Sequence, residues 1–230
     1  MSTDTLSTYK IQNMDIHETI KEIKSKFRLF MNGPVSQSMR DKGMDYKVNF
    51  GIEYPRIKEI AAGYAPNHDL AQALWKENIR ECKIMAGLLQ PVDTFYPEIA
   101  DIWIEDMRYP ELAEYTVMNL FQRLPYASEA AFRWMADERE YFQLCGFLLM
   151  ARLLSKGLML SERAEAEFLD QAFASIESEY PAVQRAAVLA LRKFAGQSDV
   201  HVQHLRKQLT PYLKSDKAEK RALAESILEY

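Results

Sequence analysis

Cysteine is scarce in this sequence of 230 residues, which contains only Cys82 and Cys145. Two cysteines so far apart form neither a secreted disulfide framework nor a C-x-x-C motif for metal or redox chemistry. They are typical of a reducing compartment, so we expect a cytoplasmic protein. Long apolar runs are missing too, because none reaches the roughly 18 residues that a membrane-spanning helix needs. The opening MSTDTLSTYK also lacks the apolar core of a signal peptide. The sequence therefore predicts no membrane partner.

Glycine is sparse as well, with 8 residues in the chain, and β-branched residues seldom cluster. Alanine, leucine, methionine, glutamate, lysine and arginine fill long stretches instead, and these residues favour helix. No segment has a convincing strand pattern. The predicted fold class is all-α.

Caps, prolines and apolar spacing predict where the helices lie. One apolar stripe runs over residues 16–30, and the segment from Gly33 to Gly51 is interpreted as a broken connection. Ser128 and Ser161 are placed to cap helices that begin after them. After the first helix, a second is expected with Pro55 near its start and its end at about Gly63. The later expected helices lie over 67–76, 78–89, 97–107, 110–124, 129–136, 138–155, 162–178 and 181–195.

Two late segments resemble each other and indicate a repeat. The segments that begin at Pro181 and Ala218 each place an arginine, Arg185 or Arg221, before small and aliphatic residues at helical spacing. The two arginines are separated by nearly the period of about 40 residues that is typical of two-helix HEAT-type repeats. Stacked pairs share one core and form a curved solenoid with a concave side. We therefore expect a superhelical solenoid of HEAT/ARM-like helix pairs, with an ordinary helical bundle as the alternative.

The domain organisation follows from this interpretation. Residues 1–15 are expected to be a flexible N-terminus and residues 16–230 a single HEAT-like repeat domain. Within that domain, residues 16–66 form an N-terminal helical cap and residues 67–230 form the helix pairs.

Charge is distributed unevenly along the chain. Lys and Arg number 29 and Asp and Glu 33, for a net charge of −4, but the local net charge is +2 over 1–92, −10 over 93–180 and +4 over 181–230. Basic ends could mark a surface that binds a polyanion. The alternative is scatter over a solvated helical surface.

Sequence marks of common catalysis are missing. There is no GxGxxG, GxxxxGK[ST] or GxSxG motif. His201 and His204 are spaced for one helix face but lack further ligands at a recognisable distance, so we interpret them as surface residues and expect no metal and no cofactor. Acidic residues crowd the stretch 101–114, where Glu111 and Glu114 could supply a general base or stabilise a cation. Solvated carboxylates around a helix junction are the alternative.

Several segments, in the right order, resemble the AlkD-like DNA alkylation repair family. They are Asn49–Ile60, the Leu74-Trp75 pair followed by Arg80-Glu81, Trp103, Phe142-Gln143, and Gln184–Ala187 leading to Leu191-Arg192. This resemblance covers most of the chain from about residue 20. It implies a HEAT-like helical solenoid. Active members of that family are glycosylases that release N3- and N7-alkylated purines while gripping the DNA backbone in a basic concave groove.

The resemblance also identifies positions where this chain departs from active members. The catalytic tryptophan and aspartate match Tyr109 and Ala113, and a second cleft tryptophan matches Leu189. A backbone-holding arginine matches Leu144, and Glu53 replaces a polar amide. Of these matched cleft residues, only Arg192 keeps its chemistry, so the resemblance implies a divergent member and does not support glycosylase activity at the matched positions. No catalytic residue is assigned; the candidates are Glu111, Glu114 and Tyr109.

Three hypotheses about function follow. In the first, the protein binds double-stranded DNA through a concave basic surface, and the expected DNA-binding residues are Arg108, Tyr109, Arg185, Arg192 and Lys193. Arg185 has the alternative role of a helix-pair contact repeated at Arg221. In the second, the chain is a non-catalytic scaffold with a protein partner on the concave face. In the third, it is an active alkylpurine DNA glycosylase that uses Glu111 or Glu114.

Overall fold

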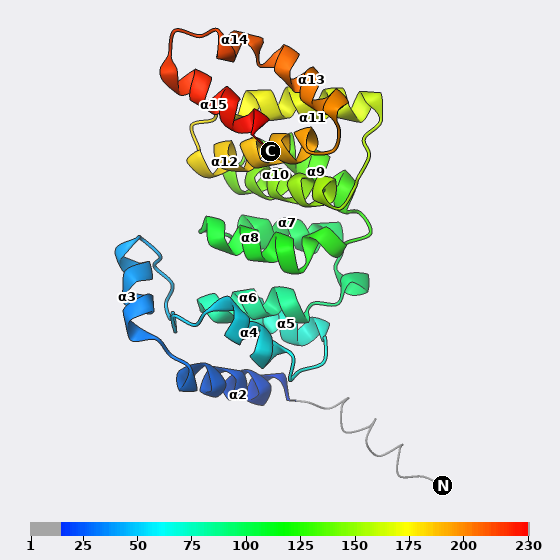
Figure 1. Cartoon of the computed structure of the whole chain (residues 1–230). Helices are drawn as coiled ribbons and strands as arrows, with labels where there is room; N and C mark the ends of the chain where they lie inside the picture. The colour runs from blue at the N-terminus through cyan, green and yellow to red at the C-terminus, as the bar shows by residue number, and fades with distance from the viewer. Residues whose placement is uncertain (1–14, 230) are drawn as a thin grey trace. The chain divides into compact units, whose positions relative to one another are not determined.

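The computed structural model describes residues 15–229 and divides the chain into two compact units, residues 1–95 and 96–230. Over the described residues the structure is built from helices, and its one β feature is an isolated bridge between Val48 and Ile79 (Figure 1). The expected all-α class is confirmed. The flexible N-terminus predicted over 1–15 lies outside the described residues except for Asp15, which caps the first described helix. The single domain predicted over 16–230 stays a prediction.

The first unit contains helices α2 to α6 and a short 3₁₀ helix. The α-helices are α2 (Ile16–Leu29), α3 (Gly33–Asp41), α4 (Tyr54–Ala61), α5 (His68–Trp75) and α6 (Arg80–Leu89), and the 3₁₀ helix is η1 (Val92–Thr94). The broken connection expected between Gly33 and Gly51 was wrong in its first part, because α3 lies there. The side chain of Asn32 caps α3 by accepting a hydrogen bond from the backbone N–H of Val35.

Two sequence segments that carried the family resemblance contact each other in this unit. The carboxylate of Glu81 accepts hydrogen bonds from the backbone N–H groups of Phe50 at 3.1 Å and Ile52 at 3.3 Å. Arg80 donates to the carbonyl oxygen of Ile52 at 2.9 Å and pairs with Glu81 at 3.2 Å. Both charged side chains are buried. The Arg-Glu pair therefore holds the segment that leads into α4 against α6.

The second unit contains helices α7 to α15 and the 3₁₀ helix η2. They are α7 (Pro97–Glu105), α8 (Pro110–Asn119), η2 (Phe121–Arg123), α9 (Ala127–Met135), α10 (Glu140–Ser155), α11 (Glu162–Ser175), α12 (Pro181–Ala195), α13 (Asp199–Gln208), α14 (Thr210–Leu213) and α15 (Ala218–Leu228). The Ser161 cap is confirmed, since its side chain accepts from the N–H of Ala164. The Ser128 cap was wrong, because α9 begins at Ala127 and Tyr126 occupies the cap position.

Helix α10 lies at the centre of this unit. It packs against α9 and α12 most extensively, and also against α7 and α8 (Figure 1). Its apolar residues surround it, as expected for a helix that is covered on most sides. Gly146 permits the closest approach: a Cβ built there would lie 2.5 Å from the backbone nitrogen of Met135 on α9. Helix α12 packs in turn on α11 and α15. This arrangement leaves one side of α10 and α12 to form the surface described next.

Candidate functional site

The exposed face of α12 carries the basic residues that the sequence singled out. The alanines and larger apolar residues of α12 are buried, among them Ala186, Ala190 and Phe194. Arg185, Leu189, Arg192 and Lys193 are at helical spacing on the opposite side and are exposed. Three of the five predicted DNA-binding residues, Arg185, Arg192 and Lys193, therefore share one solvent-facing surface.

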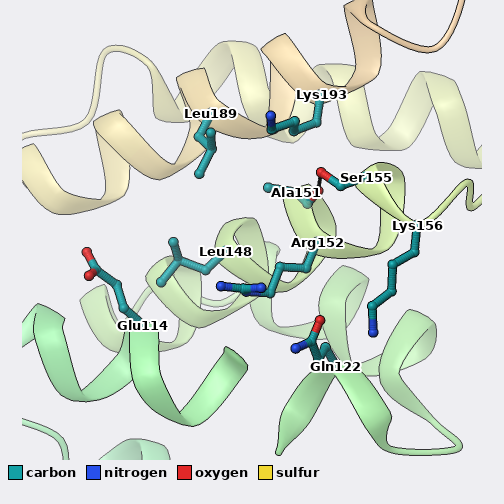
Figure 2. Close-up of a pocket in the computed structure, with 9 residues that line it drawn as sticks. All are labelled: Glu114, Gln122, Leu148, Ala151, Arg152, Ser155, Lys156, Leu189 and Lys193. Carbon is teal, nitrogen blue, oxygen red and sulfur yellow. Dashed lines mark hydrogen bonds between the residues drawn. The ribbon is translucent and has the colours of Figure 1, made fainter. Parts of the chain in front are cut away.

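A cavity of about 400 Å³ opens between this face and two neighbouring helices. We call it the first cavity. Figure 2 shows its residues coming from α8 and the following turn, from α10, and from α12. The lining residues are Glu114, Gln122, Leu148, Ala151, Arg152, Ser155, Lys156, Leu189 and Lys193. Three cations thus face one carboxylate, with an apolar wall between them.

The three cations of the first cavity have no described side-chain partner. Over residues 15–229, Arg152, Lys156 and Lys193 make no side-chain hydrogen bond or ion pair. Arg133, elsewhere in the same unit, shows the contrast, because it forms a bidentate pair with Asp101 at 2.6 and 2.8 Å. The positive charge at the first cavity is therefore available to an anion from solvent.

Glu114 is the carboxylate of this cavity, and its electrostatic surroundings are mixed. Partial burial raises its pKa above the usual glutamate range, and the nearby charge of Glu111 adds to the rise. The positive charges of Arg185 and Arg152 oppose the shift. Glu114 is thus close enough to both arginines to feel their charge, although no hydrogen bond joins them among the described residues.

Glu114 lines the first cavity, whereas Ala113, which the family resemblance matched to the catalytic aspartate, does not. Ala113 is fully buried in the core, so its side chain faces away from the first cavity. Glu111 is half-buried and influences Glu114 without lining the cavity. Arg108 and Tyr109 lie in the turn before α8, and neither lines the first cavity.

A second cavity, of about 530 Å³, adjoins the first. The two share Ser155, Leu189 and Lys193. The remaining residues of the second cavity are Leu154, Arg192, Gly196 and Gln197. Arg192 already has a partner there, because its Nη2 donates to the backbone carbonyl of Glu229 at 2.6 Å.

Sequence reasoning missed Arg152, Lys156 and Gln122. A signal was present for the first two, because Leu148, Arg152 and Lys156 are spaced by four along a helix that is otherwise rich in apolar residues. A cation inside such a stretch marks the side of the helix that is left uncovered. Gln122 gave no signal, because it lies in a turn that was expected to continue the helix over 110–124.

The described residues contain neither a metal-binding cluster nor a membrane-spanning helix. Between residues 15 and 229, no group of three or more His, Cys, Asp or Glu residues is arranged to hold a metal ion. Within the same range, no helix has the length and apolar character to cross a membrane. The Nδ1 of His204 lies 2.7 Å from a carboxylate oxygen of Glu165, and the Nε2 of His201 lies 3.8 Å from the other oxygen, so the two histidines face a shared acidic partner.

The helices and the basic cavity define an all-α repeat protein, and comparisons with known proteins identify its family. The chain belongs to the family of DNA alkylation repair enzymes, whose model matches residues 18–223. A solved structure described as a new family of proteins related to the HEAT-like repeat DNA glycosylases, with affinity for branched DNA structures, has a TM-score of 0.73. Its sequence is 17% identical, and the match covers 94% of each chain. The expected class of HEAT-like helix pairs is confirmed. No curated protein matches the chain.

Proposed function

We propose that this protein binds DNA by its phosphate backbone through the exposed surface of α10 and α12. The observation that carries the proposal is the convergence of Arg152, Lys156 and Lys193, all without described partners, on the first cavity. Phosphate contacts from Lys and Arg supply most of the affinity of such proteins, without reading sequence. Membership of the DNA alkylation repair family supports the choice of ligand. The affinity for branched DNA ascribed to the similar solved structure supports it too.

The salt dependence of binding tests this proposal. Each cation that contacts a phosphate adds about 0.9 to the slope of log affinity against log salt, which is about a 3.5-fold loss between 50 and 200 mM salt. Replacing Arg152, Lys156 and Lys193 by Ala should therefore reduce the slope by about 2.7. Wild-type protein should lose about 40-fold more affinity than this variant over that range. The measurement is fluorescence anisotropy with labelled duplex and four-way-junction DNA.

A matched control carries the same change in charge elsewhere in the second unit. Arg163, Arg206 and Lys207 are exposed on α11 and α13 and line neither cavity. Changing these three to Ala should leave the salt slope closer to that of wild type. Equal losses in the two triple variants would show that total charge, and not the first cavity, governs binding. Absence of binding at about 50 mM salt would reject the proposal and favour the protein scaffold.

Excision of alkylated purines is a second candidate, and the position of Glu114 favours it. Its carboxylate lines the first cavity beside Arg152, so one group could stabilise a cationic sugar while the other holds a phosphate. The test is release of 7-methylguanine from alkylated DNA. Glu114→Gln should abolish release, whereas Glu111→Gln should reduce it only weakly, because Glu111 does not line the cavity. No release by wild-type protein that binds DNA would reject excision while leaving DNA binding intact.

A further inference from the structure

Arg192, which lines the second cavity, is hydrogen-bonded to a group of the protein itself at the end of α15. The Nη2 of Arg192 donates to the backbone carbonyl of Glu229 at 2.6 Å, and both residues are exposed. Glu229 directly follows the last residue of α15 as its C-cap, and α15 packs on α12. An arginine expected to bind phosphate is therefore engaged by an internal acceptor.

The acceptor has the electrostatic character of a weak phosphate substitute. The last carbonyl groups of a helix have no partner within the helix and lie at the negative end of its dipole. The carbonyl of Glu229 therefore places partial negative charge beside Arg192, where a phosphate in the second cavity would otherwise come to lie.

The second cavity continues the basic surface from the first. Lys193, Leu189 and Ser155 line both cavities, and Arg192 lines only the second. A DNA strand with one phosphate near Lys193 would bring a neighbouring phosphate toward Arg192. That phosphate and the carbonyl of Glu229 would compete for one guanidinium group.

We propose that the C-terminal end of α15 is a competitive cover over a second phosphate site centred on Arg192. The inference rests on the proposed DNA binding through the neighbouring first cavity. A DNA phosphate replaces the Glu229 carbonyl at Arg192, and the end of α15 is released. The end is suited to release because Glu229 is exposed, while the nearest side chains that anchor α15 in the core are Ala224 and Ile227.

A spin label at position 229 measures this release directly. Glu229→Cys keeps the backbone carbonyl that Arg192 contacts, so the cover remains in place. The native Cys82 and Cys145 are fully buried, and burial raises the pKa of both thiols, so neither competes for the label in the folded protein. Saturating duplex DNA should sharpen the nitroxide spectrum at position 229. A label at Glu219→Cys, in the first turn of α15, should not sharpen.

Arg192→Ala provides the decisive comparison. In this variant the label at 229 should be mobile without DNA, and DNA should change its spectrum little.

The outcomes separate the two proposals. DNA binding with an unchanged spectrum at 229 would overturn the cover while leaving the first cavity's role intact. Failure to bind DNA at all would overturn both.

Discussion

The buried carboxylate of Glu81 gives the sharpest test of how the first unit is held together. Glu81 has no exposed surface, and Arg80 is only 2% exposed. The carboxylate accepts from the backbone N–H groups of Phe50 and Ile52 and from the guanidinium of Arg80. Changing Glu81 to Ala removes the acceptor for two buried backbone donors and leaves a buried cation short of its partner.

The expected cost follows from these three contacts. A buried donor left without an acceptor costs about 1–3 kcal/mol. Loss of one member of a buried ion pair costs about 3–5 kcal/mol. These losses overlap, since Arg80 keeps its bond to the carbonyl of Ile52. We therefore expect Glu81→Ala to lower the free energy of unfolding by about 4 kcal/mol. Glu81→Gln retains one acceptor oxygen, and we expect a loss of about 2 kcal/mol.

Urea denaturation followed by circular dichroism measures the loss, and hydrogen exchange locates it. The amides of Phe50 and Ile52 should exchange much faster in Glu81→Ala than in wild type, because their acceptor is gone. The double variant Arg80→Met with Glu81→Leu should be less destabilised than the sum of the single changes, because it leaves no charge uncompensated. A loss below about 1 kcal/mol in Glu81→Ala, with unchanged exchange at both amides, would refute this reasoning.

Two further predictions concern the second unit. Gly146→Ala should lower the free energy of unfolding by about 3 kcal/mol in urea denaturation, because the new Cβ would lie 2.5 Å from the Met135 nitrogen. Gly63→Ala is the control and should be close to neutral, because the atom nearest to its new Cβ is at 3.4 Å. The pKa of Glu114 is raised chiefly by burial, so its negative charge is lost at a higher pH than for an ordinary glutamate as pH falls. DNA affinity should then rise about two- to fivefold as Glu114 is protonated. At neutral pH, Glu114→Gln should bind DNA more tightly than wild type, and its affinity should lack this rise. A rise of equal size in Glu114→Gln would show that another group titrates.

The helices could be predicted well from sequence because their signals are local. Helix α12 begins at Pro181 and ends at residue 195, as expected, because a proline marks its first turn and a glycine directly follows its last residue. The Ser128 cap failed because α9 begins two residues earlier than expected, at Ala127, where no side chain caps it and so no cap residue marks the start. Helix α3 was missed because only Ser36 of its residues is buried, so it has no apolar stripe to detect.

The candidate site was predicted only in part, for a different reason. Matching Ala113 to a catalytic position depends on register, and on a helix one residue changes the direction of a side chain by about 100 degrees. Ala113 is buried while Glu114 lines the first cavity. Arg152 and Lys156 required knowledge of which side of α10 its neighbours leave uncovered, and that is set by tertiary packing. Residues far apart in sequence converge there through contacts that no local pattern encodes.

Several acidic residues of the middle segment lie in ion pairs away from the first cavity. Asp101 accepts from Arg133 and from the indole of Trp134, and Arg139 pairs with both Glu105 and Asp137. These three carboxylates are paired with cations of the same segment, and none of them lines the first cavity. Arg152 and Lys156 belong to that segment by sequence, yet they line the first cavity with Lys193 from the basic C-terminal segment. The sign of the surface is therefore set by which charges remain unpaired after folding, and a net charge of −4 is compatible with a local cluster that attracts phosphate.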